Sequence, residues 1–291
     1  MCIRDRARLE GQDLRGHWDV EGTVDPAAGA LRFVPAAASA LWARQIPVPP
    51  VRLTVNSDLP PGRGLSSSAA LCLAVLDALA RHGGCRLERH ELAELATHVE
   101  RDLIGVACGP LDPLACVAGA PVLLRWRSGG QVMIERIAPA LSLHLVVGSF
   151  AAPRDTPAIL RVLQDHMHSQ EPHHHDPRAV AAVQGALAGF GEAAELGAAA
   201  LREGDSVALG LAMDRCQGAY EHMATWVPRL RAPMLQRAVA GLRKRGALGA
   251  KFSGAGGDGS VIALYTEPRA AQQSRAWLDG QEGASAWICP I

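Results

Sequence analysis

The chain lacks the features that would point to a nucleic-acid or membrane partner. Its 291 residues include 29 Lys and Arg against 29 Asp and Glu, so the formal net charge is zero and gives no attraction for polyanions. Aromatic residues make up only 4% and do not alternate with a basic stripe. No apolar run approaches the ~20 residues that a membrane-spanning helix needs. We therefore expect a globular protein without a nucleic-acid or membrane partner.

The sequence also shows no cysteine motif of a disulfide or zinc site and no pattern typical of a signal peptide. The seven cysteines include no CxxC pair, which favours reduced thiols over disulfides or a zinc site. The first residues, 1–6, are not followed by the apolar core of a signal peptide. Both observations predict a cytoplasmic protein.

A glycine- and serine-rich stretch at residues 60–70 is the most informative part of the sequence. It follows an expected strand at 51–57 and precedes an apolar run, 69–81, that is typical of a buried helix. The first N–H groups of a helix lack internal partners and carry the positive end of its dipole, so a strand, a Gly-rich turn and a helix start together form a phosphate-binding element. The alternative is an ordinary loop with a serine N-cap. The stretch has neither the Lys of a Walker loop nor the glycine spacing of a dinucleotide fingerprint.

Two acidic residues follow at positions that need an explanation. Glu100 borders the apolar stripe of an expected helix at 88–103, and a carboxylate at the edge of a buried face needs a partner, either an Arg or a metal ion. Asp112 lies in a segment rich in Gly and Pro, residues 105–113, where it is either a turn former or helix N-cap, or a functional acid.

These motifs resemble the GHMP small-molecule kinases, the family of galactokinase, homoserine kinase, mevalonate kinase and phosphomevalonate kinase. The stretch 60–70 is similar to the family's second motif, which wraps the phosphates of ATP. Glu100, Cys108-Gly109 and Asp112 resemble a set found in galactokinases. Residues 251–259 are similar to the third motif, a Gly-rich turn between two strands. The resemblance covers roughly residues 50–265.

The sequence departs from the family at three places. Pro113 stands where the family usually has Gln or Asn, which affects sugar-specific contacts, and Asp258 stands where small residues are common, so we expect its carboxylate to point away from the phosphates. No convincing copy of the first motif, which supplies a basic residue near the acceptor hydroxyl, precedes residue 50. A truncated or mis-started reading frame is one explanation, which the genomic sequence upstream of Met1 would test.

The resemblance implies a two-domain α+β fold of the GHMP kinase type. The first domain, residues 1–150, would contain a mixed sheet with helices packed on one face, and the second, residues 151–291, would be a ferredoxin-like α/β domain. The rest of the chain predicts helices at 36–44, 179–200, 205–224, 233–245 and 268–278 and strands at 121–127, 131–137, 142–149, 260–265 and 285–289.

The resemblance also implies the chemistry. The chain would transfer the γ-phosphoryl group of ATP to a hydroxyl of a small molecule, with Mg²⁺ held by Ser68 and Glu100. Asp112 would be the catalytic residue, which either accepts the proton of the acceptor hydroxyl or only steers that hydroxyl. A sugar is the favoured acceptor, and mevalonate or phosphomevalonate is the alternative, as is a non-catalytic nucleotide-binding relative. A monomer or a homodimer is expected. The expected nucleotide-binding residues are Pro61, Gly62, Arg63, Gly64, Leu65, Ser66, Ser67, Ser68, Ala69, Gly254, Gly256 and Gly257.

Overall fold

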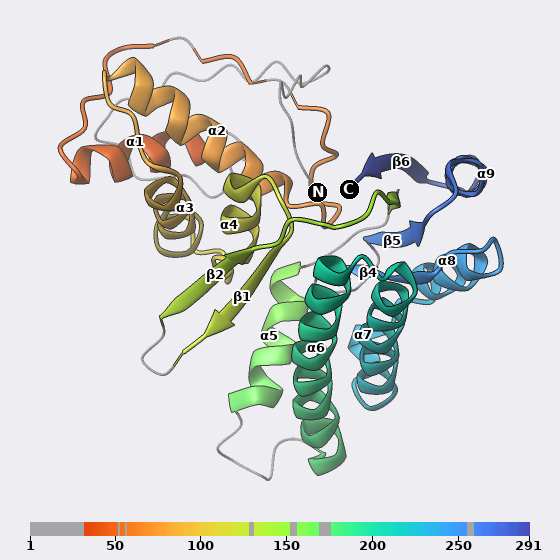
Figure 1. Cartoon of the computed structure of the whole chain (residues 1–291). Coiled ribbons are helices and arrows are strands. Elements are labelled where there is room, and N and C mark those ends of the chain that lie inside the picture. The colour runs from red at the N-terminus through yellow and green to blue at the C-terminus, as the bar shows by residue number, and fades with distance from the viewer. Residues whose placement is uncertain are drawn as a thin grey trace. The chain divides into compact units, whose positions relative to one another are not determined.

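The computed structural model describes residues 32–51, 53–55, 57–127, 131–151, 156–168, 176–254 and 259–291. The chain divides into two compact units (Figure 1): the first ends at Ala120, and the second comprises Pro121–Ile291 together with the short segment Arg63–Leu65. This division precedes the predicted domain boundary at residue 150, because the strands formed by 121–150 belong to the second unit. Among the described residues, no helix combines the length and apolar character needed to cross a membrane.

The first unit is built from helices around one apolar core. Its elements are α1 (Phe33–Ala43), α2 (Ser67–His82), α3 (Arg89–His98), which continues as the π-helical segment η2 (Val99–Leu103), and α4 (Leu111–Ala118). The start of α3 is fixed by a capping box, in which the main-chain N–H of Glu88 donates to the Glu91 carboxylate at 2.9 Å. Large side chains of α1, α2 and α3 fill the core, among them Leu41, Leu76, Leu79 and Leu95.

The sequence predicted a strand at 51–57. The described residues of that segment form no strand, although Leu53 and Val55 pack against the helical core as their alternation suggested. A half-buried alternating pattern records which side chains are covered, but a strand also needs a neighbour to hydrogen-bond with. The mixed sheet expected for the amino-terminal half is likewise not formed by the described residues of the first unit.

The second unit contains a hairpin and a four-stranded sheet. Strands β1 (Val122–Trp126) and β2 (Val132–Arg136) lie where strands were predicted and form an antiparallel hairpin; residues 128–130 between them lie outside the described residues. The larger sheet has the order β4-β5-β3-β6 and is antiparallel throughout, with bounds β3 His144–Phe150, β4 Gly249–Ser253, β5 Ser260–Tyr265 and β6 Ala284–Pro290.

Helices connect these strands in a β-α-β-β-α-β order, which is the predicted ferredoxin-like arrangement. Between β3 and β4 the chain forms a helical insertion, and α5, α6 and α7 lie alongside one another in Figure 1. A single helix connects β5 to β6. The helices are α5 Thr156–His168, α6 Pro177–Glu203, α7 Ser206–Trp226, the 3₁₀ turn η3 Pro228–Leu230, α8 Pro233–Arg243 and α9 Pro268–Asp279.

Capping residues set the ends of the long helices. The carboxylate of Asp176 accepts from the N–H of Arg178 at 2.9 Å, with Pro177 as the first residue of α6. The carboxylate of Asp205 accepts from the N–H of Ala208 at 2.8 Å and starts α7. Gly204, with φ +74°, separates the two helices and allows the chain to reverse.

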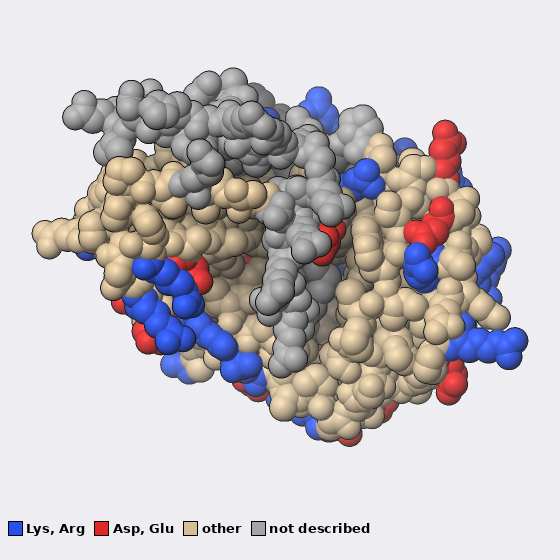
Figure 2. All heavy atoms as spheres, turned by 90° about the horizontal axis from the view of Figure 1, so that it is seen from above, with Lys and Arg blue, Asp and Glu red and all other residues tan. Residues whose placement is uncertain are grey.

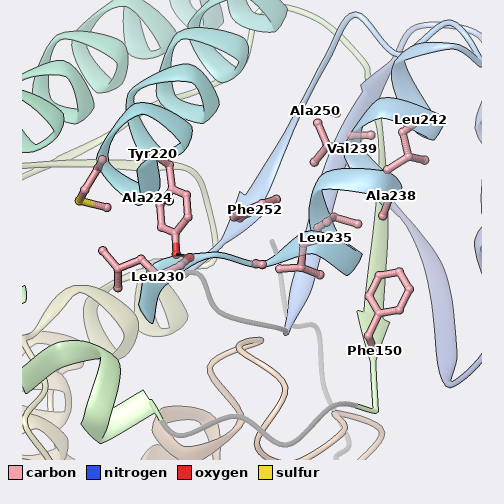
Figure 3. Packing of buried hydrophobic residues seen from close by; sticks show 14 of the residues in the cluster. Phe150, Tyr220, Ala224, Leu230, Leu235, Ala238, Val239, Leu242, Ala250 and Phe252 are labelled. Carbon is pink, nitrogen blue, oxygen red and sulfur yellow. Dashed lines mark hydrogen bonds between the residues drawn. The ribbon is translucent and has the colours of Figure 1, made fainter. Parts of the chain in front are cut away.

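The main core of the second unit lies between the sheet and its helices. Figure 3 shows Phe150 of β3, Leu235 and Val239 of α8, and Tyr220 of α7 among its members. The Tyr220 hydroxyl donates to the carbonyl of Leu230 at 2.8 Å, so this buried phenol is hydrogen-bonded and also ties α7 to the turn that follows it.

Charged side chains hold the β1–β2 hairpin to α6. Arg125 on β1 pairs with Glu195 at 2.6 Å and with Glu135 at 2.8 Å, and Arg202 pairs with Glu135 in turn. Each of these groups is more than one third exposed, so the network contributes modestly to stability. Figure 2 shows basic and acidic side chains mixed on the face that it presents, which agrees with the formal net charge of zero.

The edge strand β4 is covered by helix α7 rather than left open. Its outward N–H groups donate to two side chains of α7, from Ala250 to the Asp214 carboxylate at 3.0 Å and from Phe252 to the Gln217 amide oxygen at 2.9 Å. An unpaired strand edge is a site for aggregation, and here the helix supplies the missing acceptors.

Two glycines make this approach possible. A Cβ at Gly210 would lie 2.3 Å from the carbonyl oxygen of Leu248, and a Cβ at Gly249 would lie 2.2 Å from the carbonyl oxygen of Gly210. Both obstacles are backbone atoms, which cannot turn away as a side chain could. Helix α7 and strand β4 are therefore in direct main-chain contact.

Replacing Gly210 by Ala should separate α7 from β4 and lower the free energy of unfolding by about 1–3 kcal/mol, the usual cost of overpacking. Gly218→Ala is the matched control on the same helix, because no atom lies within 4 Å of its Cβ position. The control should be neutral or stabilising by up to about 1 kcal/mol, since Ala favours helix more than Gly. Urea unfolding followed by circular dichroism measures both, and equal effects of the two substitutions would contradict the contact.

Candidate functional site

The segment before α2 has the backbone of an anion-binding element. Gly62 and Gly64 have φ of +71° and +73°, and Ser66, the N-cap of α2, is also left-handed at φ 57° and ψ 29°. An N-cap normally lies in the β region, where its side chain can accept from the helix N–H groups; at Ser66 no side-chain cap forms. The left-handed conformation of a serine is strained, which is a feature of functional loops.

The N-terminus of α2 lies where the sequence predicted it, with Ser67 and Ser68 as the first two helical residues. The first main-chain bond of the helix runs from Ala70 N–H to the carbonyl of Ser66 at 3.0 Å. The N–H groups of Ser67, Ser68 and Ala69 therefore precede the helical hydrogen-bond ladder and carry the positive end of the helix dipole. This arrangement suits the oxygen atoms of a phosphate.

Among the described residues of the first unit, Glu100 is the most deeply buried acid, with 3% of its surface exposed. It lies in the π-helical segment that continues α3, a kind of irregularity that is frequent at functional sites. The sequence pattern assumed regular helical spacing and placed Glu100 only at the edge of the apolar face. The wider turn of the π-helix brings it fully inside.

The structure brings Ser68 and Glu100 together. The Ser68 hydroxyl donates a hydrogen bond to the Glu100 carboxylate, which lowers the pKa of that carboxyl, but burial raises it by more, so the pKa of Glu100 is above its usual value. The side chains of Ser68 and Glu100 supply hydroxyl and carboxylate oxygens, the atoms that Mg²⁺ prefers as ligands.

Asp112 completes a group of three with Ser68 and Glu100. It lies in the first turn of α4 and is exposed, yet its charge is close enough to raise the pKa of Glu100 further. The segment predicted to be non-helical through Pro113 becomes helical at Leu111. Pro113 fits there because the N–H groups of a first helical turn need no internal acceptor.

Sequence reasoning missed Arg32, which lies just before α1. Its positive charge is near Glu100 and lowers the pKa of that carboxyl, whereas its Nε is buried and has no hydrogen-bond partner among the described residues. The sequence suggested either an Arg or a metal ion as the partner of Glu100. Arg32 acts on Glu100 through its charge, but the two side chains do not form an ion pair. The sequence held no signal for this contact, because the two residues lie far apart along the chain.

Thiols also surround this group. Burial raises the pKa of Cys108 and of Cys116 to about 11, and the negative charge of Glu100 adds to both shifts. Cys72 has a pKa raised further by its complete burial, and its thiol donates to the carbonyl of Ala96 at 3.8 Å. Thiols with raised pKa values stay protonated at neutral pH, so these cysteines are packing residues rather than nucleophiles.

The third motif is described in part. Strands β4 and β5 flank it, as predicted, and Gly254 begins the turn with φ +72°. Gly256, Gly257 and Asp258 lie outside the described residues. The hydroxyl of Ser260, which follows the turn, donates to the carbonyl of Gly64 at 3.3 Å. Both residues belong to the second unit, although 196 residues separate them in sequence.

The raised pKa of Glu100 predicts that its negative charge opposes folding. A carboxyl with a higher pKa in the folded than in the unfolded state destabilises the fold fully above the folded pKa and not at all below the unfolded one, near 4.5. Glu100→Gln keeps the shape and an acceptor for Ser68. Its melting temperature should exceed that of the parent at pH 7.5, and the difference should shrink toward zero as the pH falls to 4.5.

The control for this measurement is Glu94→Gln, which changes an exposed acid on α3. Thermal unfolding of the three proteins between pH 4.5 and 8 should show a pH-dependent difference for Glu100→Gln and a smaller, flatter one for Glu94→Gln. A Glu100→Gln protein that melts below its parent at pH 7.5 would mean that Arg32 and Ser68 compensate the buried charge.

Comparison with known proteins links both units to one group of enzymes. The family pattern described as the GHMP kinases N terminal domain matches residues 31–120, and the pattern described as GHMP kinases C terminal matches residues 198–280. Galactokinase of Mycobacterium bovis is 47% identical over 88 residues, which is 29% of this chain and 24% of that enzyme. Galactokinase of Thermotoga neapolitana is 38% identical over 87 residues, 30% of this chain and 25% of the relative. The matched region is thus about a quarter of the length of these curated relatives.

Solved structures share the fold over most of the chain. Streptococcus pneumoniae phosphomevalonate kinase, in complex with phosphomevalonate and AMPPNP, has a TM-score of 0.70 at 17% identity, covering 96% of this chain and 85% of that one. L. major mevalonate kinase has a TM-score of 0.67 at 21% identity, with coverages of 88% and 75%. Lactococcus lactis galactokinase, complexed with galactose, has a TM-score of 0.65 at 18% identity, with coverages of 94% and 77%. With matches to the characteristic domains of both halves, the chain belongs to the GHMP kinase family.

Proposed function

We propose that the chain is an ATP-dependent kinase that transfers the γ-phosphoryl group to a hydroxyl of a small molecule, most favourably a sugar. The observation that carries this proposal is the group formed by Ser68, Glu100 and Asp112 at the N-terminus of α2. A hydroxyl, a buried carboxylate and an exposed carboxylate beside a phosphate-binding helix start are the side chains that phosphoryl transfer to an alcohol needs.

The nucleotide phosphates would be bound mainly by backbone groups. The left-handed residues Gly62, Gly64 and Ser66 give a bent segment, and the N–H groups of the first turn of α2 follow it. Successive N–H groups in such a segment form an anion nest, whose affinity does not depend on a lysine side chain. The assignment of the remaining residues in 61–69, and of Gly254, Gly256 and Gly257, to the nucleotide remains a prediction.

Ser68 and Glu100 would hold Mg²⁺. Their oxygens already meet in a hydrogen bond, and the burial that makes an ionised Glu100 unfavourable would be offset by a bound cation. When bound, the ion would neutralise the phosphate charge that builds up during transfer. Glu100 is thus a residue that costs stability in the empty protein and is suited to a metal ion.

Asp112 would act on the acceptor. Its carboxylate is exposed, unlike that of Glu100, and can meet a substrate hydroxyl without a large movement. A carboxylate oxygen of Asp112 would accept the hydroxyl proton as the oxygen attacks phosphorus, or would orient the hydroxyl for that attack.

The acceptor class rests on two features that favour different substrates. The spacing of Glu100, Cys108-Gly109 and Asp112 is similar to galactokinases, and two relatives that match part of the chain are galactokinases, which favours a sugar. The sequence 251–257 resembles the mevalonate and phosphomevalonate branch, which makes those acids the second candidates.

Asp112→Asn should lower turnover by about 10²- to 10⁴-fold, the usual contribution of a positioned proton acceptor, and leave ATP affinity nearly unchanged. The substitution keeps size and removes basicity. If Asp112 only stabilised the start of α4 through the helix dipole, its loss would lower the melting temperature by the equivalent of about 0.3–1 kcal/mol and leave turnover near normal. Turnover, ATP binding and melting temperature are measured on the same preparation.

Asp102→Asn is the matched control for this experiment. Asp102 is a nearby exposed acid whose carboxylate is paired with Arg101 at 2.8 Å and His98 at 2.7 Å. Its replacement removes the same charge at a place with no assigned role, so turnover should stay within a few-fold of the parent. Equal losses in both variants would refute a specific function of Asp112.

An ATP-consumption screen identifies the acceptor. With Mg²⁺ present, galactose and other hexoses should stimulate ATP consumption more than mevalonate, phosphomevalonate or homoserine do. In the same assay, Ser68→Ala should raise the Mg²⁺ concentration needed for half-maximal activity. Stimulation by mevalonate or phosphomevalonate alone would replace the sugar assignment. Tight ATP binding without turnover on any acceptor would favour a non-catalytic nucleotide-binding protein.

A further inference from the structure

A small cavity inside the second unit has no role in the proposed kinase reaction. It measures about 120 Å³ and lies among α5, α6, α7 and strand β4. Its walls are mostly apolar, and Figure 3 shows two of the lining residues, Tyr220 and Phe252, whose rings meet edge to face at 5.0 Å. The other lining groups that matter here are Leu163, Phe190, Met223, Cys216 and Lys251.

Two polar side chains of the walls, Gln217 and Tyr220, are already engaged in hydrogen bonds. The Gln217 amide accepts from Phe252 N–H and donates to Glu221 at 2.9 Å, and the Tyr220 hydroxyl donates to Leu230. Lys251 is the charged side chain among the described lining residues. Its ammonium has three donors, and the acceptor that the described residues supply is the carbonyl of Phe252, at 2.6 Å.

This lysine is unusual within the chain. Lys244 and Lys251 are the only lysines among the 29 Lys and Arg residues, and Lys244 is exposed. Burial lowers the pKa of Lys251, and the neighbouring Cys216 only partly offsets this effect. A lysine on an edge strand often serves to block pairing, but the edge of β4 is already covered by α7 and needs no such protection.

The cavity and the ammonium together define the chemistry of a ligand. A neutral apolar molecule would leave the ammonium without further acceptors, which is costly in an apolar site. A free phosphate would find one cation and apolar walls where it needs many donors. A carboxylate on a short hydrocarbon chain satisfies both parts of the site.

We propose that this cavity binds a small monocarboxylic acid, with its carboxylate paired with Lys251 and its hydrocarbon part against Leu163, Phe190 and Met223. An apolar cavity of about 150 Å³ holds a benzene molecule, so this one suits a chain of about four to six non-hydrogen atoms. The site goes beyond the kinase reaction and shares only Gly254 with the residues proposed for the nucleotide. It would exist whether or not the chain transfers phosphate.

The test uses the purified full chain and 3-methylbutanoate as the probe, with 3-methylbutanamide as its neutral match, in binding measured by calorimetry without ATP or Mg²⁺. The acid should bind saturably, and the amide about 10- to 100-fold more weakly, the range expected for loss of a hydrogen bond between charged groups. Lys251→Met should weaken binding of the acid by the same factor, whereas Lys244→Met should leave its affinity unchanged.

A second variant covers the case in which Lys251→Met does not fold. Leu163→Trp fills the cavity from α5 and keeps the lysine, so it should abolish binding of the acid while circular dichroism and melting stay close to those of the parent. Equal binding of acid and amide, equal effects of the two lysine substitutions, or binding retained with Leu163→Trp would each overturn the proposal, as would no saturable binding at all.

Chemical labelling gives an independent readout in the same protein. Trace acetylation with acetic anhydride, resolved by peptide mass spectrometry, reports the reactivity of both lysines at once. A paired carboxylate stabilises the charged amine, so 3-methylbutanoate should slow acetylation of Lys251 several-fold and leave Lys244 unaffected. An unchanged rate at Lys251 under saturating acid would contradict the assignment. Because neither readout uses turnover, failure of the kinase proposal would leave this test intact.

Discussion

The main-chain contact between α7 and β4 is the constraint on which the second unit depends. Gly210 and Gly249 let a helix touch a strand edge with backbone against backbone, and Asp214 and Gln217 then supply the acceptors that the edge lacks. This contact fixes the outer strand of the sheet, and therefore the start of the Gly-rich turn that follows β4. The same contact closes one side of the cavity around Lys251, since Cys216 and Tyr220 lie on the same helix.

In the first unit, burial of one side chain lowers stability instead of raising it. Its helices pack as an ordinary apolar core, but the π-helical segment after α3 brings an acid into that core, with a raised pKa and a serine hydroxyl as its hydrogen-bond partner. A chain selected only for stability would place an apolar or amide side chain there. A substitution that keeps the shape of Glu100 and removes its charge therefore separates its effect on stability from its effect on catalysis.

Much of this arrangement could be predicted from the sequence, because the patterns are local. Glycine and serine content before an apolar run predicted the start of α2, and helical spacing predicted α3 and the long helices of the second unit. The described residues of 51–57 do not form the predicted strand: alternation reports which side chains are covered, whereas a strand also needs another strand beside it. The two compact units divide at Ala120, whereas the domain boundary was predicted at residue 150; the strands between these positions belong to the second unit by contact.

The sequence by itself determined the family resemblance, the phosphate-binding helix start and the two acids, since each depends on residue types within a short stretch. Only the tertiary structure decided that Ser68 meets Glu100, that the charge of Arg32 lies near Glu100, and that Ser260 reaches Gly64 across 196 residues. It also decided that Lys251, which the sequence places at the start of the third motif, lines an apolar cavity. These are contacts between elements distant in the chain, and they follow from how the helices and strands pack, which no local pattern encodes.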